Sequence, residues 1–304
     1  MKCIFMYNPN SGKGKINKKY NYIVNRLKEK FSQVDVFATS YPKQMTEEAA
    51  KACGTYDYLV FAGGDGTFNE VVQGVAPYEN RPVLGYIPTG TVNDIAHTYK
   101  ISRRIRGAVN NILNGAVKEV DIFKINDCYA KYVVTAGAFT SSTYETKQSE
   151  KKKFGRLAYF FDGIRRNLKH ETFAVQLECG GESVSTYSTF VIIINSKSVA
   201  GLKINKRAVL DDGIVEGLIV MQRPNPKLKN RIAAFFEVIK IFIFGYSSII
   251  MKDKKIIKMR GDRFHIKVAD DICWNFDGEK GISGEIDISV LRKHLKLIVP
   301  KNVL

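Results

Sequence analysis

The order of secondary-structure signals in the first part of the chain constrains its fold more than any other feature. Apolar runs typical of buried strands alternate there with helical patterns. The strand-like runs are residues 2–7, 34–38, 58–62 and 83–87. The helical patterns are residues 16–31, 46–53, 68–74, 93–99 and 103–113. Strands that are joined through helices run parallel, with helices on both faces of the sheet. The sequence therefore predicts a doubly wound parallel sheet.

Beyond about Val120 the pattern changes to short β-rich runs that turn-forming residues separate. These runs are residues 132–136, 173–178, 189–194, 214–220, 264–268 and 285–290. Two helical segments, 157–168 and 230–244, interrupt them. At 304 residues the chain exceeds the size at which one core usually stops growing. We therefore expect a second, β-sandwich-like domain and an α/β plus β architecture.

The charge of the chain points to anionic partners. Lys and Arg total 47 against 30 Asp and Glu, a formal net charge of +17. These side chains are seldom buried unpaired, so the surface is strongly positive. Nucleic acid, nucleotide phosphates and acidic lipid headgroups all suit such a surface. The sequence holds no recognisable nucleic-acid reader motif, and we expect no nucleic-acid partner.

The cysteines and the apolar runs bear on location. The five cysteines are scattered and form no C-x-x-C pair, which favours a reducing, cytoplasmic setting. The longest apolar stretch, Ile232–Phe244, contains Glu237 and Lys240 and is shorter than the roughly 20 residues that span a bilayer. We therefore expect any membrane association to be peripheral. The Lys- and Arg-bearing segments 151–166 and 227–240 would attract anionic lipid.

The sharpest motif is Gly63-Gly64-Asp65-Gly66-Thr67, which lies between an apolar strand and a helix. Glycines at the end of a strand let the backbone turn tightly and approach an anion, and the helix N-terminus adds a partial positive charge. A carboxylate in such a loop makes sense mainly when a divalent cation lies between it and phosphates. The motif therefore predicts a metal-assisted phosphate site.

Two further loops follow predicted strands in the same way. Residues 8–15, N-P-N-S-G-K-G-K, offer backbone amides and lysines but do not form a Walker A motif. Residues 88–94, P-T-G-T-V-N-D, offer hydroxyls and Asp94, which could equally cap a helix. All three loops lie at the carboxyl ends of parallel strands, the edge at which doubly wound sheets bind ligands.

In the second domain two acidic turns, L-D-D-G at 210–213 and N-F-D-G-E at 275–279, are bordered by β runs. Each is compatible with an ordinary hairpin turn. A hydroxyl that accepts a phosphoryl group nevertheless needs a base, and a carboxylate can supply it. Asp277 precedes a glycine, where its carboxylate is expected to bond local backbone amides, so Glu279 is the better base.

Together these five motifs, in this order, resemble the diacylglycerol kinase catalytic domain of soluble bacterial lipid kinases, which is similar to sphingosine kinases. The resemblance covers essentially the whole chain. It implies an ATP-binding domain at 1–125, a lipid-substrate domain at 126–290, and a segment 291–304 that packs back on the first domain. The active site would lie in the cleft between the domains. The implied activity is transfer of the γ-phosphate of MgATP to a membrane lipid, most directly diacylglycerol, in phospholipid biosynthesis.

The resemblance also assigns roles by motif. Asp65, closest to the substrate Mg²⁺, and Glu279, the proton acceptor, would be catalytic. Asp212 would hold a structural Mg²⁺ with the carbonyl groups of Val209 and Ile214. Acidic positions that support the metal network correspond to Asp94 and Asp121. The residues implied to contact ATP are Asn10, Ser11, Gly12, Lys13, Gly14, Thr39, Gly64, Asp65, Gly66, Thr67, Phe68, Asn69, Glu70 and Thr91.

Two other functions share some of these features. NAD kinases also carry a G-G-D-G loop and two domains, but their T-G-S-T-A-Y stretch is not reproduced at residues 135–144. A nucleotide-dependent regulatory protein without turnover would not need the acids Asp65, Asp212 and Glu279. The choice of lipid hydroxyl and the oligomeric state, a homodimer included, stay open at this stage.

Overall fold

The computed structural model describes residues 1–9, 14, 16–137, 172–206, 208–245, 250 and 252–303. The chain divides into two compact units. One comprises Met1–Ile122 and Arg292–Leu304, and the other comprises Phe123–Leu291. Two strands, β5 (Ala116–Ile125) and β15 (Ile286–Val299), run from one unit into the other. Within the described ranges no helix is both long enough and apolar enough to cross a bilayer.

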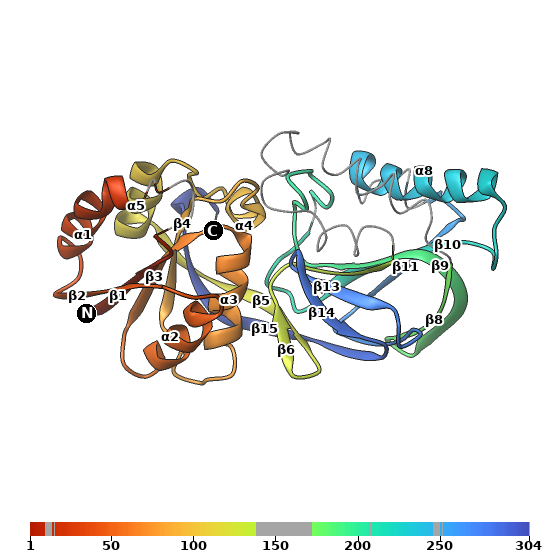
Figure 1. Ribbon diagram of the computed structural model, residues 1–304, viewed down its shortest axis with the longest axis horizontal. Coiled ribbons are helices and arrows are strands. Elements are labelled where there is room, and N and C mark those ends of the chain that lie inside the picture. Colours follow the sequence, from red (N-terminus) through yellow and green to blue (C-terminus); the bar gives the residue numbers. More distant parts are fainter. Residues whose placement is uncertain are drawn as a thin grey trace. The chain divides into compact units, whose positions relative to one another are not determined.

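The first unit is built on a parallel sheet with the strand order β2-β1-β3-β4, and the end of β15 adds in parallel beside β4 (Figure 1). Its strands are β1 (Lys2–Tyr7), β2 (Gln33–Ala38), β3 (Tyr58–Gly63) and β4 (Val83–Pro88). After their first residue, β3 and β4 are buried throughout, which is why they appear in the sequence as continuous apolar runs. Gly63 pairs with Pro88, so the loops that follow β3 and β4 begin side by side.

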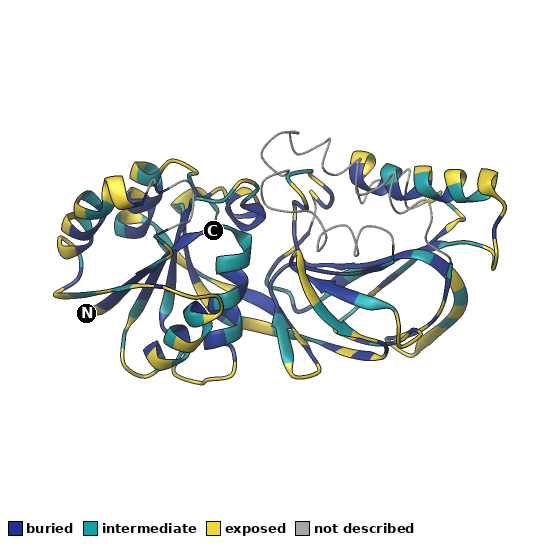
Figure 2. Ribbon diagram, viewed as in Figure 1, coloured by how far each residue is buried: buried dark blue, intermediate teal, exposed yellow. Residues whose placement is uncertain are grey.

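Helices cover both faces of this sheet. α1 and α5 pack on one face, where Phe5, Leu27 and Ile112 share a core, and α2 and α3 lie on the other, where Phe68 packs on Phe61. Figure 2 shows the strands largely buried and the helices exposed on their outer sides. The helices are α1 (Tyr20–Lys28), α2 (Gln44–Ala52), α3 (Asp65–Val75), α4 (Asp94–Thr98) and α5 (Ile105–Asn114), with short 3-10 turns η2 (Asn17–Lys19) and η4 (Lys301–Val303).

The second unit is antiparallel. The long strand β9 pairs with β8 along its first half and with β7 and β10 along its second. Other pairs are β10 with β11, β12 with β8 and β15, β13 with β7 and β14, and β5 with β6. The strands are β6 (Cys128–Ala130), β7 (Val133–Gly137), β8 (Phe173–Cys179), β9 (Glu182–Ile194), β10 (Val215–Met221), β11 (Ile256–Gly261), β12 (Arg263–Lys267), β13 (Cys273–Phe276) and β14 (Glu279–Ser283).

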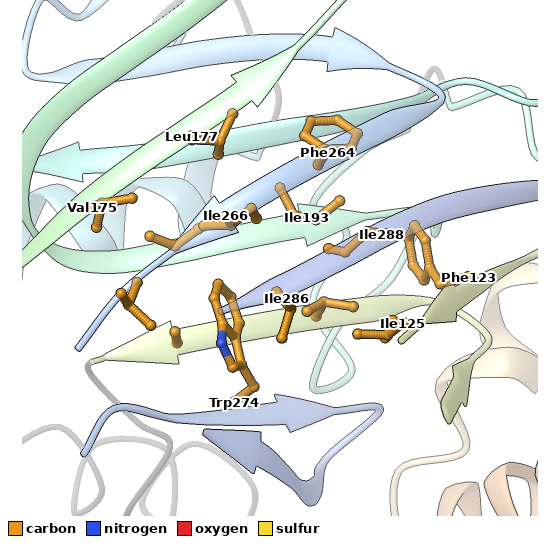
Figure 3. Close-up of a cluster of buried hydrophobic side chains, with 14 of the residues drawn as sticks. Phe123, Ile125, Val175, Leu177, Ile193, Phe264, Ile266, Trp274, Ile286 and Ile288 are labelled. Carbon is orange, nitrogen blue, oxygen red and sulfur yellow. The ribbon is translucent and has the colours of Figure 1, made fainter. Parts of the chain in front are cut away.

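One hydrophobic core fills this unit (Figure 3). Trp274 is fully buried in it, and its indole N–H donates to the carbonyl oxygen of Gly284 at 2.7 Å. Phe123 on β5, Leu177 on β8 and Phe264 on β12 contribute to the same core. Side chains from so many strands meet because each strand turns alternate residues inward, as in β8, whose burial alternates strictly. The predicted α/β plus β fold is confirmed.

Several element predictions were incomplete. The predicted strand 189–194 is the second half of β9. The first half of β9 was missed because it is mostly polar and alternates between exposed and partly buried residues. The strand β11 was missed because Lys258 and Arg260 interrupt its apolar pattern. The predicted helix 230–244 is present as α8 (Leu228–Phe244), and the predicted helix 157–168 lies outside the described residues.

Candidate active site

The glycine-rich loop, which leads from β3 into α3, is tightly packed. Gly64, in extended conformation, caps α3, and its carbonyl oxygen accepts the N–H of Phe68 at 3.0 Å. A Cβ atom on Gly63 would lie 2.2 Å from the hydroxyl oxygen of Thr67, so this position requires glycine. The first-turn N–H groups of α3 therefore begin directly at the carboxyl edge of the sheet, where they can receive an anion.

The loop after β4 is packed directly on the glycine-rich loop. The N–H of Thr89 donates to the carbonyl oxygen of Gly63 at 2.8 Å. A Cβ atom on Gly90 would lie 2.6 Å from the Cα atom of Gly64, closer than real atoms approach. Two of the three loops singled out in the sequence are therefore in contact, backbone against backbone.

The Asp65 carboxylate joins the two loops. One carboxylate oxygen accepts the backbone N–H of Asn93 at 2.7 Å, and the other accepts that of Asp94 at 2.7 Å. Asn93 adopts the left-handed conformation (φ 59°) just before α4. The carboxylate thus lies at the N-terminus of α4, where the orphan amides and the helix dipole favour a negative charge. Asp94 is the first residue of α4 and is buried.

A buried tyrosine completes this arrangement and was missed in the sequence. The Tyr86 hydroxyl lies 3.2 Å from the Gly63 carbonyl oxygen and 3.2 Å from the Asn93 side-chain oxygen. Burial, together with the charges of Asp65 and Asp94, raises the pKa of Tyr86 well above its usual range. The hydroxyl therefore stays protonated and acts as a donor. A lone polar group in the otherwise apolar strand 83–87 was the signal available in the sequence.

Two further predicted ATP contacts, Gly14 and Thr39, lie in the segments that follow β1 and β2. Asn10, Ser11, Gly12 and Lys13 lie outside the described residues, whereas Gly14 is described and has φ +70° with open space around its Cα. Thr39 follows β2, and its N–H donates to the carbonyl oxygen of Tyr7 at the end of β1.

Thr91 and Phe68 differ in what they can offer a ligand. Thr91 is exposed, and its carbonyl oxygen accepts the guanidinium of Arg103 at 3.2 Å. Arg103 is a basic residue at this edge that sequence reasoning missed. The Phe68 ring is buried against Phe61 and Tyr86, so only its backbone can face a ligand.

Glu70 and Asn69 belong to the body of α3. Asn69 is buried, and the Glu70 carbonyl oxygen accepts the Thr46 hydroxyl at 3.0 Å. The first-turn residues Gly66 and Thr67 are partly exposed.

Asp121, the other predicted acid of the first unit, is fully buried on β5. Its carboxylate accepts the backbone N–H of Lys293 at 2.7 Å. Lys293 has φ 52°, so the carboxylate stabilises an unusual backbone conformation in β15. This contact links β5 to the last strand of the sheet.

In the second unit, Asp277 is a structural residue. Its buried carboxylate accepts the backbone N–H groups of Lys131 (2.5 Å), Tyr132 (2.9 Å) and Val133 (3.0 Å). The expectation of amide partners holds, but these partners lie across the unit rather than in the local turn. The reason is that Asp277 adopts φ 54° in the turn between β13 and β14, which aims its side chain inward.

Glu279 differs from Asp277 in its setting. It is the first residue of β14, and its side chain is exposed. The two acids of the N-F-D-G-E motif therefore have different environments, one bonded to the backbone inside the unit and one at its surface.

Asp212 accepts the backbone N–H of Ile214 at 3.0 Å with one carboxylate oxygen. The other oxygen contacts the guanidinium of Arg260 at 3.2 Å, and Arg260 also lies 3.8 Å from Glu216. Val209 is exposed. No group of three or more His, Cys, Asp or Glu side chains suited to a metal occurs within the described part of the chain.

Comparison with known proteins identifies the family of the chain. The family model of the diacylglycerol kinase catalytic domain matches residues 2–125. A diacylglycerol kinase of Staphylococcus epidermidis is 31% identical over 300 residues, which is 98% of this chain and 92% of that protein. One of Bacillus subtilis is 29% identical over 299 residues, 97% of this chain and 95% of that protein.

A solved structure gives the same result for the fold. The crystal structure of a diacylglycerol kinase from Bacillus anthracis superposes with a TM-score of 0.81 at 25% sequence identity, covering 100% of this chain and 98% of that chain. The similarity extends across both units. The chain therefore belongs to the diacylglycerol kinase family and is a lipid kinase.

Proposed function

We propose that this lipid kinase transfers the γ-phosphate of ATP to the hydroxyl group of a membrane lipid, with diacylglycerol as the acceptor and phosphatidic acid as the product. The observation that carries the proposal is the pair of interlocked loops after β3 and β4, joined by the Asp65 carboxylate. Kinase catalysis depends mainly on positioning and on electrostatic stabilisation of the transferred phosphoryl group, and a preorganised loop pair provides both.

The nucleotide phosphates would bind at the N-terminus of α3. The N–H groups of Gly66 and Thr67 belong to the first turn of that helix. Gly64 carries no side chain, which makes room for the backbone of Gly90 beside it. The residues of the first loop, Asn10 to Gly14, would complete the site by family resemblance.

A divalent cation suits this edge of the sheet. Asp65 and Asp94 are close enough to Tyr86 for both charges to raise its pKa, so two negative charges are concentrated there. Mg²⁺ is typically held by one or two carboxylates together with substrate phosphates, and it would neutralise charge on the transferred group.

We assign the proton transfer to Glu279. The acceptor oxygen forms a bond to the γ-phosphorus, the bond between that phosphorus and the β,γ-bridging oxygen breaks, and the hydroxyl proton passes to the Glu279 carboxylate. ADP leaves with the electron pair of the broken bond. Asp277 is unsuited to this role because three backbone N–H groups stabilise its ionised form.

A second Mg²⁺ at Asp212, with carbonyl groups of Val209 and Ile214, would support the second unit. The Arg260 guanidinium, 3.2 Å from the carboxylate, competes with a cation for this position. Replacing Arg260 by Gln should therefore increase the thermal stabilisation that Mg²⁺ provides. An Asp212→Asn variant should abolish the Mg²⁺ effect, and an unchanged response in both variants would exclude the site.

The acceptor lipid resides in a membrane. We therefore also propose that the enzyme is cytoplasmic and contacts anionic membrane surfaces peripherally, attracted by its net charge of +17.

The test of the proposed activity uses γ-labelled ATP and Mg²⁺ with micelles of diacylglycerol, a sphingoid base or a polyprenol, and with NAD in a parallel reaction. Label in phosphatidic acid is expected. Label in NADP, or in another lipid alone, would contradict the assignment.

A further inference from the structure

Helix α8 is apolar on two opposite sides. Its inner side is buried in the second unit, where Ala234, Val238 and Ile241 lie and the Phe242 ring packs 6.0 Å from that of Phe190. A surface helix normally turns polar side chains to the solvent opposite its buried face. α8 does not follow this rule.

The opposite side of α8 carries four large apolar side chains that are exposed. Leu228 is 66% exposed, Ile232 40%, Phe236 55% and Ile243 64%. At 3.6 residues per turn these four positions fall within roughly 80° of arc, so they form one continuous line, here called the outer stripe. Figure 2 shows the exposed residues recurring along α8. A contiguous apolar surface of this kind marks an interaction site.

Basic side chains lie beside the N-terminal half of α8. An open hollow of about 830 Å³ adjoins this end of α8, and Arg223, Lys227, Lys229 and Lys255 line it together with Glu237. Four basic side chains against one carboxylate make the hollow positive. Glu237 is also engaged, because Lys240 and Lys255 contact it at 2.7 and 3.2 Å.

The outer stripe and the basic side chains therefore lie on or beside the same helix. We propose that the outer stripe of α8 inserts into the surface of an anionic lipid bilayer, with the helix axis in the plane of the membrane and the basic hollow against the lipid headgroups. The proposal rests on the proposed function, because the lipid acceptor would be drawn from that bilayer. Helices that lie in the interfacial region of a membrane typically carry large apolar residues such as leucine and phenylalanine on one side and basic residues on the other.

The charge favours a membrane over a second copy of the chain. A copy of the same chain would bring the same basic hollow to the contact, whereas a bilayer that contains acidic lipid supplies the opposite charge. Membrane binding and dimerisation also differ in solution, since a dimer would form without lipid.

The first test measures binding to vesicles of phosphatidylglycerol and phosphatidylcholine without ATP or diacylglycerol. An Ile232→Gln/Ile243→Gln double variant should raise the Kd at least tenfold, which corresponds to about 1.4 kcal/mol. Tyr78→Gln, an exposed aromatic side chain (46%) in the first unit, is the matched control and should leave the Kd within twofold. Thermal melting should be unchanged in both. Equal binding of the double variant and the control would overturn the proposal.

The second test locates the helix directly. The single tryptophan, Trp274, is fully buried and gives a constant fluorescence background. A Phe236→Trp variant should show a blue shift on vesicles and quenching by brominated acyl chains, whereas Tyr78→Trp should show neither. Quenching of neither tryptophan, or a dimer in sedimentation without lipid that the double variant dissociates, would contradict insertion. Because no turnover is measured, intact vesicle binding without kinase activity would overturn the proposed function alone.

Discussion

The Asp65 carboxylate accepts the backbone N–H of Asn93 at 2.7 Å, across two loops that are 28 residues apart in the sequence. Its second oxygen makes the equivalent bond to the next residue, Asp94. The carboxylate that the sequence places closest to a metal thus also determines the shape of the neighbouring loop. Changes at Asp65 should therefore affect both catalysis and local structure.

Replacing Asp65 by Asn should lower kcat more than tenfold, a barrier increase above about 1.4 kcal/mol, because an amide lacks the charge for a metal. It should also lower stability by about 1–3 kcal/mol, since the amide group turns an N–H toward Asn93 or Asp94. Steady-state kinetics and urea unfolding measure the two effects. Asp57→Asn is the control, because Asp57 also accepts a backbone N–H, that of Lys2 at 2.7 Å, and should retain full turnover.

Removing the Tyr86 hydroxyl should loosen the contact between the loops. We expect Tyr86→Phe to cost about 1 kcal/mol of stability and to raise the KM for ATP, because Asn93 and Gly63 lose a buried donor. Tyr56→Phe provides the comparison, since its hydroxyl bonds Asp35 at 2.8 Å. That variant should lose similar stability without a change in KM. Equal KM values in both variants would argue against a positioning role for Tyr86.

Replacing the two acids of the N-F-D-G-E motif should have different effects, one on kcat and the other on stability. Glu279→Gln should reduce kcat by roughly 10²- to 10⁴-fold while the thermal midpoint stays unchanged, as expected for a lost general base. Asp277→Asn should instead destabilise the protein by about 3 kcal/mol, because three backbone N–H groups lose a charged acceptor. Normal turnover in the glutamine variant would refute the base assignment.

Two histidines should give opposite pH responses of stability. The hydrogen bond to Asp287 raises the pKa of His265 above 6.5, so its contribution is complete below that pH and is lost as the pH rises through the folded pKa. Burial lowers the pKa of His294 below 6.5, so its contribution is present above that pH and is lost as the pH falls. Urea midpoints at pH 5, 6, 7 and 8 for His265→Gln and His294→Gln, against the parent protein, should show these opposite slopes. Parallel profiles for the two variants would contradict the assignment.

The sequence revealed the glycine-rich loop because the features that define it are local. Gly63, Gly64 and the start of α3 are adjacent in the chain, and their conformational demands follow from residue type alone. The same applies to the parallel strands, whose continuous apolar runs reflect burial on both faces.

The partners of the acidic residues could not be predicted in the same way. The Asp277 carboxylate bonds the N–H of Tyr132, which lies 145 residues earlier in the sequence. Nothing in the turn N-F-D-G-E distinguishes this contact from the local amide bonds that such turns usually make. Tyr86 was overlooked for a related reason, because its role depends on Asn93 and Gly63 in two other loops.

The boundary between the two units was equally hard to place from the sequence. β5 runs through it without a break, so no glycine- or proline-rich linker marks the point. The basic residues of α8 were visible in the sequence, but the exposure of its outer stripe depends on which face the second unit buries.

The pairing of β15 with β4 has a consequence during protein synthesis. Leu297 pairs with Leu84, and Ile298 belongs to the core of the first unit. The side-chain amide of Asn111 on α5 also donates to the Ile298 carbonyl oxygen at 3.2 Å. The ribosome makes these residues only after the whole of the second unit. The β4 edge of the nascent first unit therefore stays unpaired until β15 has been translated. This unit completes its core last, although most of it is translated first.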